Sequence, residues 1–252
     1  MDIAGKRIWV TGASTGIGAA LARELADRGA SVAISARSAD KLTQVAAGRM
    51  HVEPLDVTDR TGTVAAGAAV RAALGGLDVV VANAGTWSQF RVDQWDSQAF
   101  ADHLAINLMG TVHTLEAVVP TMLEQGTGRI VGTASVAGYR GLPGSEAYGA
   151  SKAALLNLFE SLRGSLGPRG IVVQTLSPGF VRTPMTDRND FPMPFLISAE
   201  ASARAIAAGM TRDKAEVVFP WPMMVAMKAA RLVPVRAWTG LTAALVRRGM
   251  IR

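Results

Sequence analysis

Short apolar segments that alternate with longer helical patterns constrain this chain more than any other feature. Seven segments have the length and apolar content of buried strands, at residues 7–11, 31–35, 50–54, 77–82, 129–134, 171–177 and 216–220. Helical patterns separate and follow them at residues 17–28, 39–47, 59–74, 93–104, 107–124, 147–166 and 198–211. Runs such as LDVVVANAG and GIVVQTLSPG are apolar without alternation, which is typical of parallel strands buried on both faces. The pattern predicts an α/β fold with a doubly wound, seven-stranded parallel sheet and helices on both faces.

Length and composition are consistent with a single domain. The chain has 252 residues, of which 49% are hydrophobic and 18% charged, so one sizeable core can form. We expect one domain, with its main part at residues 1–220 and a basic, apolar helical extension of the same domain at residues 221–252. The count of 0 Cys excludes disulfide scaffolds and cysteine nucleophiles. The 3 His are scattered, so no metal site is predicted.

Charge is distributed unevenly along the chain. Lys and Arg number 26 against 20 Asp and Glu, a net charge of +6. Six of the basic residues follow residue 219, where no acidic residue occurs: Lys228, Arg231, Arg236, Arg247, Arg248 and Arg252. The preceding body is therefore neutral, with 26 − 6 = 20 basic against 20 acidic residues, which argues against nucleic-acid binding. The first residues lack the pattern of a secretory signal, so a cytoplasmic location is expected.

A glycine-rich turn connects the first strand to the first helix. TGASTGIG, residues 11–18, places Gly12, Gly16 and Gly18 where backbone amides and the helix dipole would meet a pyrophosphate. The spacing differs from G-x-G-x-x-G, and a merely tight connection is the alternative interpretation. The position between a strand and a helix favours a Rossmann-type dinucleotide site.

The end of the second predicted strand indicates which dinucleotide binds. An acidic residue there would contact the ribose 2′-hydroxyl of NAD, whereas an Arg accommodates the 2′-phosphate of NADP. Arg37 and Ser38 stand at this position, and no carboxylate does. We therefore expect NADP(H) to be favoured over NAD(H), unless Arg37 is an ordinary surface residue.

Tyr148 and Lys152 lie one helical turn apart in AYGASKAAL, so their side chains share a face. A phenol titrates near pH 10, and its pKa would have to fall by about 2–3 to make it useful near neutrality. An ammonium about 4 Å away supplies about 4 kcal/mol at an effective dielectric of about 20, which is enough to lower the pKa of the phenol by that amount. The pair is therefore a candidate proton-transfer site.

Together these motifs resemble the classical short-chain dehydrogenase/reductase family over roughly residues 5–185. The resemblance is carried by TGASTGIG (11–18), DV (56–57), NAG (83–85), Asn107, Ser135, YGASK (148–152) and PGFVRT (178–183). Two positions differ from common family patterns. Ala82 precedes Asn83 where a second Asn is frequent, and Thr15 stands where many NADP-dependent members carry Lys or Arg. The expected NADP preference therefore depends on Arg37.

The resemblance implies roles for individual residues. Tyr148 would be the acid/base, Ser135 would hold the substrate oxygen, and Lys152 would bind the nicotinamide ribose while lowering the pKa of Tyr148. Asn107 would anchor a water in the proton relay. The implied cofactor-binding residues are Gly12, Ser14, Thr15, Gly16, Ile17, Gly18, Arg37, Ser38, Asp56, Val57, Asn83, Ala84, Gly85, Tyr148, Lys152, Pro178, Gly179, Val181 and Thr183.

The resulting hypothesis is an NADP(H)-dependent oxidoreductase that transfers a hydride between the nicotinamide and a carbonyl or secondary alcohol, as a homodimer or homotetramer. Trp87, Arg140, Leu142 and a lid at residues 185–196 are expected around an apolar substrate cleft. The alternative is a non-catalytic dinucleotide-binding regulator or a membrane-surface protein on the same fold. The presence of Tyr148 favours the enzyme.

The C-terminal extension predicts two short helices, residues 223–233 and 235–248, separated by Pro234. Neither reaches the roughly 18 apolar residues of a transmembrane helix. Three interpretations remain: packing over the cleft or another subunit, in-plane attachment to an anionic membrane, and a disordered end. Packing is favoured, because without these helices the substrate cleft would be poorly shielded from water.

Overall fold

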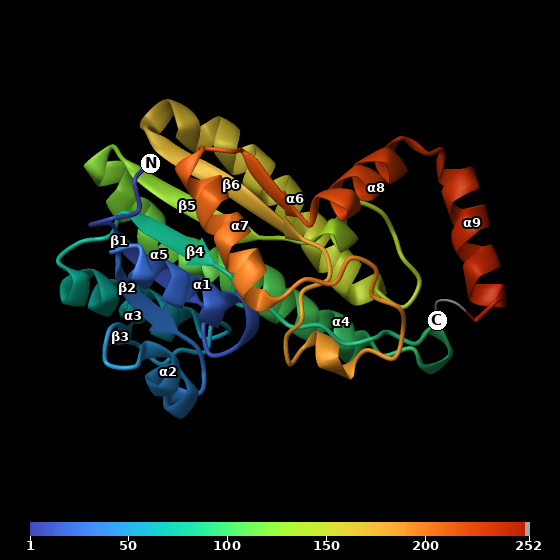
Figure 1. Ribbon diagram of the computed structural model, residues 1–252, viewed down its shortest axis with the longest axis horizontal. Helices are drawn as coiled ribbons and strands as arrows, with labels where there is room; N and C mark the ends of the chain where they lie inside the picture. The colour runs from blue at the N-terminus through green and yellow to red at the C-terminus, as the bar shows by residue number, and fades with distance from the viewer. Residues whose placement is uncertain (250–252) are drawn as a thin grey trace.

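A computed structural model describes residues 1–249 (Figure 1). Its seven strands form one parallel sheet in the order β3-β2-β1-β4-β5-β6-β7. The strands are β1 Arg7–Thr11, β2 Ser31–Ser35, β3 His51–Val52, β4 Val79–Ala82, β5 Gly128–Thr133, β6 Ile171–Pro178 and β7 Glu216–Phe219. The doubly wound, Rossmann-type sheet expected from the sequence is confirmed.

Helices cover both faces of this sheet. They are α1 Gly16–Asp27, α2 Ala39–Ala46, α3 Arg60–Leu74, α4 Ser97–His103, α5 Gly110–Gln125, α6 Glu146–Leu166, α7 Ala199–Thr211, α8 Trp221–Leu232 and α9 Val235–Arg247. Ile8 and Val10 of β1 face the layer of α1, α2 and α7, whereas Trp9 faces α3, α5 and α6. Successive strand residues are thus buried on opposite sides, as the continuous apolar runs require.

Three predicted elements differ from the structure. Residues 93–104 do not form one helix, because a 3₁₀ turn at Val92–Gln94 ends before Asp96 caps α4 by accepting the Gln98 N–H at 2.8 Å. The helix expected at residues 107–124 instead begins as a π-helical segment, Leu104–Met109, that leads into α5. The strand expected at residues 50–54 shortens to β3, because only two of its residues pair with β2. The other bounds agree to within two residues.

The two C-terminal helices lie at one end of the molecule (Figure 1). Met223 and Met227 of α8 are buried against Val136 and Tyr139, which follow β5. Helix α8 thus packs on the rest of the domain, while most of α9 is exposed and projects away from the sheet; packing over a substrate cleft or another subunit stays a prediction. No helix within residues 1–249 has both the length and the apolar character needed to traverse a bilayer.

Candidate active site

The glycine-rich turn and the NAG segment meet where neighbouring strands β1 and β4 end. The Thr11 hydroxyl accepts the backbone N–H groups of Asn83 at 3.1 Å and Ala84 at 3.3 Å. The Asn83 side chain donates in return to the carbonyls of Thr11 at 3.1 Å and Gly12 at 3.2 Å. This is the point at which the strand order reverses, where open α/β sheets bind their ligands.

Close contacts with neighbouring backbone and side-chain atoms explain the three glycines of the turn. A Cβ on Gly12, whose φ is +67°, would lie 2.6 Å from Cα of Ala84, and one on Gly18 would lie 2.4 Å from the Gly12 carbonyl oxygen. A Cβ on Gly16 would lie 2.9 Å from Cγ2 of Thr183. The N-cap residue Thr15 makes no side-chain capping bond, so amides of the first turn of α1 are left for a ligand. The turn fits a dinucleotide pyrophosphate.

Tyr148, Ser135 and Lys152 come together beside this turn. Tyr148 and Lys152 lie in the first two turns of α6, and Ser135 follows β5. The Ser135 side chain hydrogen-bonds the Tyr148 side chain. Lys152 is 3% exposed, its Nζ donates to the Thr133 carbonyl at 2.9 Å, and it lies 5.7 Å from the Tyr148 ring centroid. A half-buried phenol, a buried hydroxyl and a buried amine thus share one site.

Burial controls the ionisation of this site. It raises the pKa of Tyr148 above 10.0, although the hydrogen bond with Ser135 acts in the opposite direction. It lowers the pKa of Lys152 to about 7. The expectation that Lys152 lowers the pKa of Tyr148 is wrong for the protein alone, because desolvation is the larger effect on both groups.

Asn107 is fully buried in the π-helical segment and connects three parts of the site. Its Oδ1 accepts the Thr86 N–H at 2.7 Å, and its Nδ2 donates to the Thr86 carbonyl at 3.1 Å and to the Ser151 hydroxyl at 2.9 Å. Ser151 donates in turn to the Tyr148 carbonyl at 2.7 Å. A Cβ on Gly85 would lie 3.1 Å from Oδ1 of Asn107 and 3.5 Å from Nζ of Lys152. Asn107 therefore positions the NAG segment against α6.

Sequence reasoning missed His103, which is buried beside Tyr148 with the two ring centroids 6.4 Å apart. Its Nδ1 lies 2.6 Å from the Ala99 carbonyl and its Nε2 accepts the Ser88 N–H at 3.2 Å. This arrangement requires the neutral tautomer with the proton on Nδ1. No spacing signal in the sequence singles out this residue.

Residues expected around the adenosine lie at the ends of β2 and β3. Arg37 is exposed, and Ser38, the N-cap of α2, makes no side-chain capping bond. Bonds from the Thr58 N–H at 3.0 Å and hydroxyl at 2.8 Å hold the pKa of Asp56 below its usual value, with a smaller contribution from the charge of Arg37. Val57 is buried against Gly110.

The segment after β6 closes the opposite side of the site. The Pro178 carbonyl accepts the Ser135 hydroxyl at 3.4 Å, and Gly179 contacts Met223 of α8. Val181 is buried and pairs with Ile197, while Thr183 lies against Gly16.

Three aromatic rings connect the segment that follows β4 with the segment that follows β6, near Tyr148 and Ser135. The Phe191 ring lies 6.0 Å from that of Trp87 and 6.1 Å from that of Phe180. The sequence predicts Arg140 at the cleft, but this residue instead binds the extension, where its Nη2 donates to the Val233 carbonyl at 3.0 Å. Leu142 likewise packs with Met223 and Met227.

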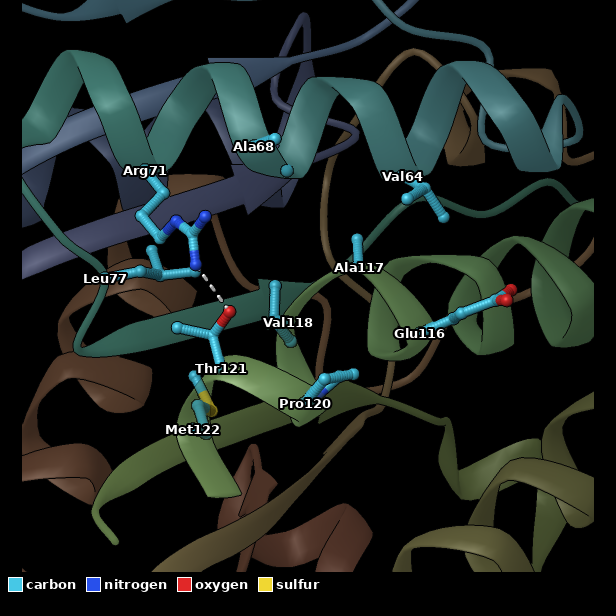
Figure 2. Close-up of a pocket in the computed structure, with 11 residues that line it drawn as sticks. Val64, Ala68, Arg71, Leu77, Glu116, Ala117, Val118, Pro120, Thr121 and Met122 are labelled. Carbon is cyan, nitrogen blue, oxygen red and sulfur yellow. Dashed lines mark hydrogen bonds between the residues drawn. The ribbon is translucent and has the colours of Figure 1, made fainter. Parts of the chain in front are cut away.

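A separate hollow of about 210 Å³ lies between α3 and α5 (Figure 2). Arg71 and Thr121 hydrogen-bond across it at 2.8 Å, and Glu116 pairs with Arg60. No residue of the glycine-rich turn, of residues 83–85 or of the Tyr148 site lines this hollow, so we assign the chemistry to the strand ends. No cluster that could hold a metal occurs among the residues that the structure describes.

The family model for short chain dehydrogenases matches residues 6–191. The chain belongs to the short-chain dehydrogenase family. An uncharacterized oxidoreductase of Myxococcus xanthus is 40% identical over 231 residues, which cover 89% of this chain and 91% of the relative. One from Staphylococcus epidermidis is 35% identical over 211 residues, covering 81% and 90%. This member of the family is therefore an oxidoreductase.

Solved structures of the family share the fold. A short-chain dehydrogenase from Streptomyces avermitilis superposes with a TM-score of 0.80 at 25% identity, covering 97% of this chain and 99% of that one. A short-chain dehydrogenase/reductase from Burkholderia phymatum, solved in complex with NAD, gives a TM-score of 0.82 at 24% identity, covering 90% and 93%. These likenesses show that the fold is shared.

Proposed function

We propose that this oxidoreductase uses NADP(H) to interconvert a carbonyl group and a secondary alcohol on an apolar small molecule, with Tyr148 as acid/base. The observation that carries the proposal is the grouping of the half-buried Tyr148 with the buried Ser135 and Lys152 beside the glycine-rich turn. When bound, the nicotinamide would supply or accept the hydride. The protein must then deliver a proton to the carbonyl oxygen, for which Tyr148 and Ser135 offer adjacent hydroxyls.

Each residue has a distinct role in this proposal. The raised pKa keeps Tyr148 protonated at neutral pH, which suits donation to a carbonyl oxygen during reduction. Ser135 orients the same oxygen, since its hydroxyl already bonds that of Tyr148. Lys152 reaches the site from beneath Gly85 and would bind the ribose of the cofactor. Asn107 holds the Thr86 backbone in place and would also anchor the proton-relay water.

The preference for NADP(H) is proposed from Arg37 and Ser38. Arg37 is exposed at the end of β2, and the nearby carboxylate of Asp56 is occupied by Thr58. A 2′-phosphate would receive charge-assisted bonds from a guanidinium there. The remaining cofactor contacts are proposed at the glycine-rich turn, Asp56–Val57, residues 83–85 and residues 178–183. The relative from Burkholderia phymatum was solved with NAD, so both dinucleotides belong in the test.

An apolar substrate is supported by the rings of Trp87, Phe180 and Phe191, which bring apolar surface to the segments on either side of the reacting hydroxyls. The preference for apolar substrates is tested by measuring NADPH oxidation with a panel of aldehydes and ketones of increasing apolar size. We expect KM to fall as apolar area grows, and Phe191→Ala to weaken that trend while leaving kcat on a small aldehyde within about threefold. Activity restricted to small polar carbonyls would contradict it.

The second candidate is a protein that binds the dinucleotide without turning over a substrate. Such a protein would have no use for a buried lysine beside its tyrosine, because burying an amine with no charged partner is costly. NADPH binding with no oxidation across the whole carbonyl panel would favour this candidate. A homodimer or homotetramer stays a prediction, to be checked by light scattering.

A further inference from the structure

We propose that the outward faces of α8 and α9 bind the surface of an anionic lipid membrane. We call this region the α8–α9 surface and define it by Trp221, Val225, Leu232, Val235, Arg236 and Arg247. Its position at one end of the molecule leaves it accessible (Figure 1). The proposal is independent of the reaction, since none of these residues belongs to the active site.

Helix α8 carries two apolar stripes on opposite sides. Met223, Met227 and Ala230 form the inner stripe and are buried against the body. The outer stripe consists of Trp221, Val225, Ala229 and Leu232, whose spacing of i, i+4, i+8 and i+11 places them on one face of a helix. A surface helix that only packs on its own domain needs one apolar stripe, so the outer one calls for another explanation.

The outer stripe of α8 and the first residue of α9 are strongly exposed. Trp221 is 72% exposed, Leu232 86% and Val235 66%. Leu232 and Val235 flank the two-residue connection between the helices, so their side chains project from a corner of the molecule. Large exposed apolar side chains that gather in this way mark a contact surface, whereas single ones are ordinary.

The basic residues of the extension indicate that the partner of the α8–α9 surface is anionic. The chain has six basic and no acidic residues after residue 219. Two are already engaged, because Lys228 pairs with Glu216 at 3.0 Å and Arg231 lies over the Tyr139 ring at 5.4 Å. Arg236 and Arg247 are exposed and form no ion pair with any residue in 1–249. Apolar side chains beside unpaired guanidinium groups are complementary to an anionic lipid surface. The apolar side chains insert at the boundary of the acyl chains, and the guanidinium groups bind the anionic headgroups.

A second copy of the chain fits this surface less well. A twofold contact places the same patch of each subunit against the other, so the basic residues of both extensions would face one another with no acidic residue between them. Like charges in such a contact oppose binding. The body holds α9 by only a few contacts, among them the bond from Trp238 Nε1 to the Gly141 carbonyl at 2.8 Å, so the rest of α9 is free to meet lipid.

Co-sedimentation with vesicles tests the proposal on the full chain. We expect binding to phosphatidylcholine vesicles that contain phosphatidylglycerol, and at least about tenfold weaker binding to phosphatidylcholine alone. Binding should be largely lost in about 1 M salt, where charges are screened beyond about 3 Å. Equal binding to both vesicle types, or to neither, overturns the proposal.

Variants separate the two contributions. Arg236→Gln/Arg247→Gln should weaken vesicle binding at least about tenfold, since each basic residue near an anionic surface contributes about fivefold. Leu232→Ser/Val235→Ser should weaken it similarly. The matched control Arg169→Gln/Arg212→Gln removes two exposed basic residues elsewhere on the protein. The loss of vesicle binding in this control should be less than half of that in Arg236→Gln/Arg247→Gln. Equal losses in the control overturn the proposal.

Two further measurements keep the result unambiguous. Circular dichroism should show that all three variants are folded, because every substituted side chain is exposed. Light scattering should give the same mass for Leu232→Ser/Val235→Ser as for the wild type. A lower mass would assign the α8–α9 surface to a subunit contact and overturn the proposal. Since vesicle binding requires no turnover, it can succeed or fail independently of the proposed reaction.

Discussion

Lys152 donates a 2.9 Å hydrogen bond from Nζ to the carbonyl of Thr133, at the last residue of β5. This carbonyl is the one hydrogen-bond acceptor found for the amine within residues 1–249. One neutral acceptor compensates little of the cost of burying an ammonium, which is why the pKa of Lys152 falls to about 7.

Stability should therefore rise with pH in the cofactor-free protein. Between about pH 7 and pH 10 the unfolded chain keeps Lys152 protonated while the folded chain does not, so raising the pH favours folding. We expect a gain of about 2 kcal/mol in the free energy of unfolding from pH 7 to pH 9, since a pKa difference of one corresponds to about 1.4 kcal/mol. Urea denaturation at both pH values measures it. Lys152→Met should remove most of the gain, and an equal gain in that variant would contradict the assignment.

Tyr148→Phe should lower kcat at least about a hundredfold in carbonyl reduction, because the proton donor is lost. Its dissociation constant for NADPH should stay within about threefold, since the hydroxyl is not a phosphate contact. Tyr139→Phe is the matched control, because Tyr139 is the other tyrosine of the chain and bonds Glu216. Comparable losses of kcat in the two variants would refute the role of Tyr148.

Arg37→Ala should reduce the preference for NADPH over NADH. We expect the wild type to bind NADPH at least about tenfold more tightly, which corresponds to one charge-assisted contact of about 1.4 kcal/mol or more. Fluorescence titration of both cofactors measures the ratio, and Arg169→Ala, an exposed residue after α6, serves as the control. A wild type that prefers NADH would show that Arg37 is an ordinary surface residue.

Asn107→Ala should destabilise the protein and slow the reaction together. The substitution leaves the partly buried N–H and carbonyl of Thr86 without their partner, at up to about 1–3 kcal/mol for each unpaired group. Ser151→Ala leaves both Thr86 contacts in place, removes the third contact of Asn107 and the bond to the Tyr148 carbonyl, and should cost about 1 kcal/mol. Urea denaturation gives both values. A larger loss in the free energy of unfolding for Ser151→Ala than for Asn107→Ala would show that the Thr86 contacts do not dominate the contribution of Asn107 to stability.

Local signals made much of this structure predictable. The strand, glycine turn and helix of residues 7–28 are specified by neighbouring residues, and the continuous apolar strands indicated a parallel sheet covered by helices on both faces. The shared face of Tyr148 and Lys152 follows from helical spacing. The sequence therefore led to the family, which the match over residues 6–191 confirms.

Other features depend on contacts between distant segments. The π-helical segment that turns Asn107 toward Thr86 has no local signature in its sequence. Arg140 follows Ser135 closely enough to suggest the cleft, yet its partners Val233 and Trp238 come from residues more than ninety positions later. The direction of the Tyr148 pKa shift depends on burial, which residue spacing does not reveal.

The contact between Met223 and Gly179 has a practical consequence for anyone who shortens or tags this protein. Cγ of Met223 lies 2.9 Å from where a Cβ of Gly179 would be, so α8 forms a wall of the segment that follows β6. Cutting the chain before α8 would expose Val136 and Tyr139 to water and release that segment. A truncated enzyme would therefore lose solubility and cofactor affinity at once, so fusions and deletions are better introduced after α9.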